Sequence, residues 1–403
     1  MPRSRPLPGS LPTVLLSRRS FGISALSLAA AGLAGCAGNN IGGGSPSPET
    51  PASASPAGDP IGQGQYRVAL ILPLSGGGNA GLAAQSMKNA AELALSEFSS
   101  TDIQLLVKDD AGNPQLARMV ANQAMDEGAQ IILGPLFAQT VQAAGSVARP
   151  RNIRVIGFST DTSVAARGVY LLSFLPETDV ARVLSYASAN GKRSYAAIIP
   201  ENAYGSVVEA KFREDVARRG GRVAALERYE KTQLQTAINA VAQAARSADA
   251  IFIPDGGDVA PDIARGLAAG GVNTRRAQLL GTGLWDDPRI FGDTAMLGGV
   301  YAAPDPAGFA SFAQRYRARY GGEPVRTATL AYDATALVVA LVRSQGPQRI
   351  TDEMLTNPSG FAGIDGIFRF KPDGTNERGL AVMQVASGGG QIVSAPPKSF
   401  TGS

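Results

Sequence analysis

The stretch that decides the fold is IQLLVKDDAGNPQLARMVANQAMDEGAQIILG, residues Ile103 to Gly134. It opens with the apolar run IQLLVKDD and closes with a second one, AQIILG, and both are typical of buried strands. Between them, PQLARMVANQAMDEG carries apolar residues at helical spacing, and Pro114 suits the first turn of a helix. A strand, a helix and a strand in this order predict a parallel sheet covered by helices.

The same alternation extends to both sides of this stretch and then restarts near residue 179. VALILP (68–73) and AAIIP (196–200) are both apolar strands closed by proline, and each precedes a polar loop with glycine and then a helix. This weak internal repeat predicts an α/β protein with two Rossmann-like lobes, each a parallel sheet flanked by helices. The helices and short strands after residue 308 are expected to complete the two lobes.

The composition excludes several classes of function. The chain has 403 residues, of which 44% are hydrophobic, so it can bury a sizeable core. It has no histidine and one cysteine, which excludes Ser-His-Asp and Cys-His catalysis, internal disulfides and the common zinc sites. Phosphate-binding and hydrolase motifs are absent as well. We therefore predict a protein that is not an enzyme and that uses neither a metal nor a cofactor.

The basic charge belongs to the first segment of the chain. The four arginines before Cys36 are the only charged residues there, and they account for the whole formal charge of +4. The rest of the chain shows no dense basic patch interleaved with aromatic residues, so nucleic-acid binding is not expected.

Residues 1–35 have the pattern of an export signal. SRRSFGI (17–23) is followed by an apolar run that is too short to span a bilayer. The paired arginines resemble a twin-arginine signal, and an ordinary secretory signal is the alternative. LAGC (33–36) resembles a bacterial lipobox, which implies that Cys36 carries lipid and anchors the protein to a membrane. Residues 36–65, rich in Gly, Ser, Pro and Ala, are expected to form a disordered tether before a folded domain at 66–395.

The candidate binding residues lie in the loops that follow the predicted strands, because open α/β sheets bind ligands at the carboxyl ends of their strands. Ser75 and its three glycines suit an anion or form a plain turn. Ser159 and Thr160 suit a ligand carboxylate or cap the next element. Tyr204 stacks on a ligand or packs between the lobes. The full candidate set is Ser75, Phe137, Ala138, Ser159, Thr160, Asp161, Tyr204, Asp255, Trp285, Asp286 and Asp287.

The order of several motifs resembles that of the type 1 periplasmic binding proteins, the leucine/isoleucine/valine-binding family. These motifs are VALILPLSG, KDDAGNPQLA, IILGPL, VIGFSTD, IIPENAYG and LAYDATALVVALV, and the resemblance runs from residue 67 to about 393. It implies two lobes that close on a ligand, joined by three crossover segments near Phe174–Glu177, Gly299–Pro304 and Gly360–Gly366. The first lobe would then span about 66–175 plus 302–358, and the second about 176–301 plus 359–395.

In the amino-acid-binding members of this family, a glutamate of the second lobe holds the ligand ammonium. By the resemblance, its place here is Gly283, within GTGLWDDP (281–288). Either Asp255, Asp286 or Asp287 supplies the missing carboxylate, or the ligand is not a free amino acid. GTGLWDDP itself is expected on the rim of the second lobe and not in the core, with packing of one face of Trp285 against that lobe as the alternative.

A subgroup is also suggested by ILGPLF, GVYLLSFLPE, GTGLWDDP and YAAPDP, together with the lipobox and tether. They resemble the penicillin-binding-protein activators, which implies a lipid-anchored regulator of peptidoglycan synthesis that contacts a peptidoglycan synthase. The alternative is a substrate-binding lipoprotein that serves the permease of an ABC importer for amino acids or a related small polar solute. Both predictions place the protein in the periplasm of a Gram-negative bacterium, anchored to the outer or the inner membrane.

Overall fold

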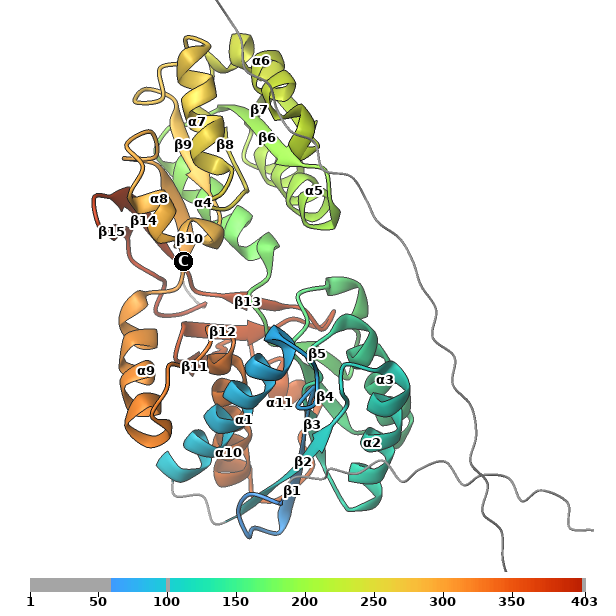
Figure 1. Ribbon diagram of the computed structural model, residues 1–403. Helices are drawn as coiled ribbons and strands as arrows, with labels where there is room; N and C mark the ends of the chain where they lie inside the picture. Colours follow the sequence, from blue (N-terminus) through green and yellow to red (C-terminus); the bar gives the residue numbers. More distant parts are fainter. Residues whose placement is uncertain (1–58, 99–101, 401–403) are drawn as a thin grey trace, which may run out of the picture. The chain divides into compact units, whose positions relative to one another are not determined.

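The computed structural model describes residues 59–98 and 102–400 (Figure 1). The predicted export signal, Cys36 and the tether up to residue 58 lie outside these residues. In the described part of the chain, no helix has the length and apolar character needed to cross a membrane.

The first sheet contains five parallel strands in the order β2-β1-β3-β4-β5. The stretch from Ile103 to Gly134 forms β2, α2 and β3, as the sequence predicts. Asn113 caps α2 by accepting hydrogen bonds from the N–H groups of Gln115 and Leu116, and Pro114 is the first helical residue. The strands are β1 (Tyr66–Leu72), β2 (Ile103–Asp109), β3 (Ile131–Leu133), β4 (Arg154–Gly157) and β5 (Val169–Leu171), and α2 is Pro114–Asp126.

Helices cover both faces of this sheet (Figure 1). Val68, Leu70 and Leu72 of β1 pack in a core formed with α1 (Asn79–Glu97) and α10 (Ala328–Gln345). Ala69 and Ile71 pack instead with α2 and α3 (Ala138–Ala148) on the opposite face. From Val68 to Leu72 the strand is apolar because its alternate side chains are buried on both sides. A satellite aromatic cluster joins α9 (Pro306–Tyr320) to α1 and α10.

The second sheet has seven strands in the order β15-β14-β10-β9-β8-β6-β7. Its strands β6 to β10 are parallel, while β14 and β15 add an antiparallel edge. Helices α4 and α5 pack on one face, and α6 and α7 on the other. These observations confirm the predicted fold class of parallel sheets flanked by helices. The strands are β6 (Ser194–Pro200), β7 (Arg222–Tyr229), β8 (Ala250–Phe252), β9 (Gln278–Gly281), β10 (Val300–Ala303), β14 (Ala381–Ala386) and β15 (Gly389–Ser394); the helices are α4 (Pro176–Ala189), α5 (Ala203–Arg218), α6 (Leu234–Ala245), α7 (Ala260–Ala269) and α8 (Pro288–Phe291).

A third, three-stranded antiparallel sheet consists of β11 (Phe361–Gly363), β12 (Gly366–Phe370) and β13 (Asn376–Arg378). The sequence analysis placed this segment in the second lobe, but Phe368 and Phe370 belong to the core of the first sheet. Both aromatic side chains lie on one face of β12, so this small sheet is amphipathic and covers the first core. The chain therefore passes to the second sheet between β13 and β14, at residues 379–380, and not at 360–366.

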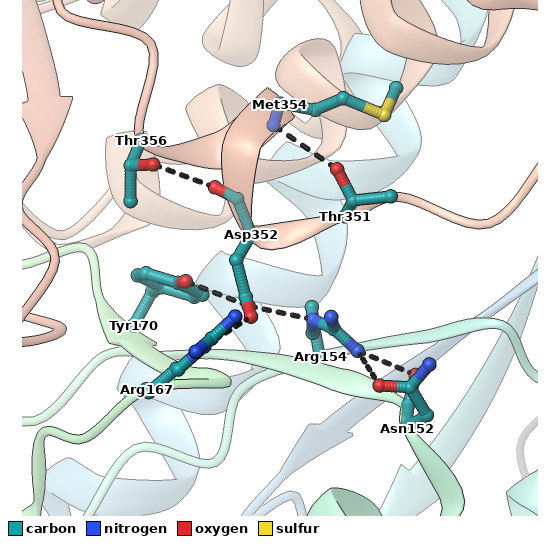
Figure 2. A network of polar contacts seen from close by, with 8 residues as sticks. All are labelled: Asn152, Arg154, Arg167, Tyr170, Thr351, Asp352, Met354 and Thr356. Atoms are coloured by element: carbon teal, nitrogen blue, oxygen red, sulfur yellow. Dashed lines mark hydrogen bonds and ion pairs between the residues drawn. The ribbon is translucent and has the colours of Figure 1, made fainter.

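In a short segment after α10, a single carboxylate binds three side chains of the first sheet and its loops (Figure 2). Asp352, at the start of α11 (Asp352–Leu355), accepts hydrogen bonds from Arg154 Nε at 2.7 Å, Tyr170 OH at 2.8 Å and Arg167 Nε at 3.0 Å. Partial burial opposes ionisation, but these three donors outweigh it and hold the pKa of Asp352 below its usual range. Asp352 thus connects α11 to β4 and β5.

We expect Asp352→Asn to lower the free energy of unfolding by about 2 to 3 kcal/mol at neutral pH, because charge-assisted hydrogen bonds are lost. The folded-state pKa is depressed, so the stabilisation is present above the unfolded-state pKa, near 3.8, and is lost as pH falls through the folded-state pKa. Urea unfolding at a series of pH values tests this. The exposed neighbour change Glu353→Gln should cost less than about 0.5 kcal/mol; an equal loss in both variants would contradict the assignment.

Candidate ligand-binding site

On the first sheet, a carboxylate organises the loops that follow β1 and β2. Asp109 accepts hydrogen bonds from the N–H groups of Ser75 at 3.1 Å and Ala111 at 2.8 Å. Asp110 accepts from the N–H of Gly112 at 2.9 Å, and burial raises its pKa to about 6. Both aspartates hold backbone groups of the loops. Ser75 is consequently fixed at the edge of this sheet.

The loops after β3 and β4 contain the other candidates of the first sheet. Phe137 precedes α3 and is 41% exposed, and Ala138 is the first residue of that helix. Ser159 is buried, and its hydroxyl accepts a hydrogen bond from the N–H of Asp161 at 3.0 Å. Asp161 in turn caps the following 3-10 turn through Ser163. Ser159 and Asp161 therefore shape the loop, and Thr160 between them is exposed.

On the second sheet, the loops after β6 and β9 meet. The hydroxyls of Tyr204 and Thr282 lie 2.9 Å apart. The N–H of Gly283 donates to Asp179 Oδ2 at 2.9 Å, although the two residues are 104 positions apart in the chain. A Cβ atom on Gly283 would lie 3.2 Å from the same oxygen. A carboxylate from the first turn of α4 therefore sits beside the position where the sequence lacks one.

Asp179 is a candidate site residue outside the predicted set, because it lies in the first turn of a helix and not in a loop that follows a strand. The signal that could have found it is the acidic first turn of a helix that starts directly after the first crossover. Burial raises the pKa of Asp179 to about 7, the N–H of Gly283 opposes this shift, and the nearby charge of Glu177 adds to it. Glu177 accepts a hydrogen bond from the hydroxyl of Thr162 at 3.2 Å.

The charges of two carboxylates act on the hydroxyl of Tyr204. Burial is the main cause of its raised pKa, the hydrogen bond with Thr282 lowers it, and the charges of Asp179 and Asp255 raise it further. Asp255 accepts hydrogen bonds from the hydroxyl of Tyr229 and from the N–H of Gly256. It also lines a pocket of about 400 Å³ at the carboxyl ends of β6, β7 and β8.

The two aspartates of GTGLWDDP are engaged away from Gly283. Asp287 caps α8 through the N–H of Arg289 at 2.8 Å and forms an ion pair with the same side chain at 2.6 Å. Asp286 is exposed and accepts a long hydrogen bond, 3.4 Å, from Tyr301. Asp179, which is not among the three predicted substitutes, is the carboxylate that accepts a hydrogen bond from the N–H of Gly283.

A sequence model of the periplasmic binding protein family matches residues 65–390. The chain belongs to this family. A periplasmic location follows from that membership, and the leucine-binding fold expected from the sequence is confirmed.

Solved structures of several solute-binding proteins have the same fold. A Rhodospirillum rubrum protein assigned to a branched-chain amino acid ABC transporter has a TM-score of 0.73 and 21% identity, covering 81% of this chain and 99% of that one. A branched-chain amino acid ABC transporter ligand-binding protein from Burkholderia xenovorans has a TM-score of 0.66 and 18% identity, covering 84% and 97%. A substrate-binding protein from Desulfitobacterium hafniense in complex with Leu has a TM-score of 0.59 and 16% identity, covering 81% and 99%. A search of curated proteins finds no significant match.

Trp285 corrects the expectation that GTGLWDDP is a rim segment without a role in the core. The indole is fully buried in the core of the second sheet, and its Nε1 donates to the carbonyl of Ile253 at 3.1 Å. A Cβ atom on Gly281 would lie 2.1 Å from the indole, and one on Gly299 would lie 2.8 Å from it. Two glycines therefore make the space that the tryptophan fills, and the buried indole anchors the loop in the second core.

In this periplasmic binding protein, Trp285→Leu should lower the free energy of unfolding by about 3 kcal/mol, because it leaves a cavity in the second core. Leu284 is 47% exposed, so Leu284→Ala should cost less than about 0.5 kcal/mol. Urea unfolding followed by circular dichroism measures both values. Equal stability of the two variants would show that the indole is not part of the core.

Proposed function

We propose that this periplasmic binding protein is the solute-binding component of an ABC importer and takes a small polar solute that carries an amino group. The observation that carries the proposal is the carboxylate of Asp179, held beside Gly283 and close to Tyr204 and Thr282. A buried ammonium group needs a paired negative charge. The resemblance requires a carboxylate at the position of Gly283, and Asp179 is the carboxylate that accepts a hydrogen bond from Gly283.

The charge state of Asp179 suits a cationic ligand. Its pKa of about 7 means that only about half of the free protein carries an ionised Asp179 at neutral pH. An ammonium group beside it would favour the ionised form and be hydrogen-bonded by it. Thr160 and the N-terminal N–H groups of α3 are the donors that we assign to an acidic group on the same solute.

The polar rim favours the importer over the regulator. A filled or apolar cleft would suit a protein that acts only by contact with a peptidoglycan synthase, whereas the loops here bring together hydroxyls and a carboxylate. The similar solved structures belong to ABC transporter systems. The comparisons give no support to the activator function predicted from the sequence. We propose an importer permease as the partner.

Calorimetric titration with amino acids tests the proposed solute class. We expect at least one of them to bind, and the corresponding acid without its amino group to bind at least tenfold more weakly. Asp179→Asn should weaken binding of the amino acid by at least tenfold, because it removes one partner of a buried charge pair. Asp287→Asn is the matched control, since Asp287 is already paired with Arg289, and it should leave affinity within about twofold.

The affinity for the amino acid, measured by the same titrations, should change with pH in one direction. Asp179 has to lose its proton to pair with an ammonium group, so affinity should fall as pH drops from about 8 to about 6, through the pKa of about 7. Asp179→Asn should not show this dependence. The absence of binding for every amino acid at millimolar concentration, or a pH-independent affinity of the unaltered protein, would reject the proposal.

We also propose that Cys36 is lipidated and anchors the protein to a membrane. The support is the order of basic segment, apolar run and LAGC before a tether-like sequence. In a Gram-negative host, the full chain should incorporate labelled palmitate and sediment with membranes, and Cys36→Ser should do neither. Labelling that persists in Cys36→Ser would refute the assignment. Separation of the inner and outer membranes on a density gradient then identifies the membrane.

A further inference from the structure

A second pocket has Thr162, from the loop after β4, and Glu177, from the first turn of α4, among its lining residues. Its volume is about 820 Å³, and it is lined by α4, the C-terminal half of α5, the β12–β13 hairpin and residues 394–400. The lining is mostly basic, with seven Lys or Arg side chains against three glutamates. An excess of positive charge in a concave site attracts anions.

Four of the seven basic side chains are neutralised by neighbours. Lys211 and Arg218 pair with Glu214 and with the buried Asp215. On the hairpin, Arg369 pairs with Glu377, and Lys371 pairs with Asp373. These pairs leave Arg182, Arg219 and Arg378, which have no carboxylate within ion-pair distance among residues 59–98 and 102–400.

Arg182 and Arg219 project from adjacent helices and have only neutral partners. Arg182 donates to the carbonyl of Leu380 at 2.7 Å and to the hydroxyl of Ser394 at 2.8 Å, and burial lowers its pKa. Arg219 makes two long hydrogen bonds to α4, of 3.3 and 3.4 Å. Its Nε is buried and has no hydrogen-bond partner in the described part of the chain.

Arg378 has more unused hydrogen-bond donors than Arg182 or Arg219. It is 4% exposed, and its guanidinium lies 4.7 Å from the ring centre of Phe174. Nε donates to the carbonyl of Ser173 at 3.0 Å, but both terminal nitrogens are buried without a hydrogen-bond partner among the described residues. Burial lowers its pKa, and the charges of Asp333 and Asp365 oppose this shift. A buried cation with unused donors is costly unless an anion meets it.

The two nearby acids do not fill this role. Asp365 is bound by Arg326 and by the hydroxyl of Thr329. Asp333 accepts a hydrogen bond from the N–H of Ile364 at 2.8 Å, and burial raises its pKa to about 7. Neither forms an ion pair with Arg378 within the described residues.

We propose that this pocket binds a small organic anion through Arg182, Arg219 and Arg378, at a site separate from the proposed solute site. Guanidinium groups match the geometry of phosphate and carboxylate oxygens. The volume exceeds that of a single oxyanion, and Leu175, Leu380 and Phe400 supply apolar lining. The ligand class is therefore a carbon compound with a phosphate group or with several carboxylates.

Calorimetric titration of the full chain tests the site with three probes: citrate, glycerol 3-phosphate and inorganic phosphate. We expect the two organic anions to bind, at least tenfold more tightly than inorganic phosphate, and to weaken as NaCl is added. Arg219→Gln and, separately, Arg182→Gln should each weaken binding by at least tenfold. Two independent variants keep the test decisive if one of them does not fold.

Arg213→Gln is the matched control. Arg213 lies on α5, is exposed and pairs with Glu209 outside the pocket, so its substitution should change the affinity for the anions by less than twofold. Amino-acid binding should be unchanged in Arg219→Gln, so failure of this proposal is distinguishable from failure of the proposed function. No binding of either organic anion, or an equal loss in Arg213→Gln, would overturn the proposal.

Discussion

The first sheet has to be covered on both faces, and half of its cover comes from the other end of the chain. Alternate side chains of β1 point to α2 and α3 on one side and to α1 and α10 on the other. The segments from α9 to β13 return to this sheet. They follow every strand of the second sheet except β14 and β15. Parallel strands are buried on both faces, so the chain has to return to the first sheet to cover it. The chain therefore passes three times between the sheets.

The positions of these passages decide where charged groups gather. The first passage ends at α4, whose first turn contains Glu177 and Asp179. The third follows β13, which carries Arg378 against Ser173 and Phe174 of the first passage. Segments far apart in sequence therefore place carboxylates beside the loop of Gly283 and an arginine beside the second pocket. The two sites have opposite charge, and each is located by the same connections.

The fold followed from local patterns. An Asn-Pro pair such as Asn113-Pro114 favours the start of a helix when a segment with apolar residues at helical spacing follows. Capping and proline geometry involve only neighbouring residues, so this signal is local. Apolar strands such as β1 are recognisable for the same reason. The family resemblance then ordered these elements correctly. The assignment of β12 was less successful, since Phe368 and Phe370 indicate burial but not the core in which they are buried.

The proposed binding site depends on contacts that local sequence patterns do not predict. Strand–helix order alone placed Ser75, Thr160 and Tyr204 in loops at the carboxyl ends of strands, because that edge is set by strand direction. The meeting of Asp179 with Gly283 depends on packing between a helix and a loop 104 residues apart. The burial of Trp285 depends on Gly281 and Gly299, which come from neighbouring strands and leave the volume that the indole fills. Helical periodicity and capping are therefore determined by short stretches of the chain. Charge pairing and the filling of cavities arise only when distant stretches are brought into contact.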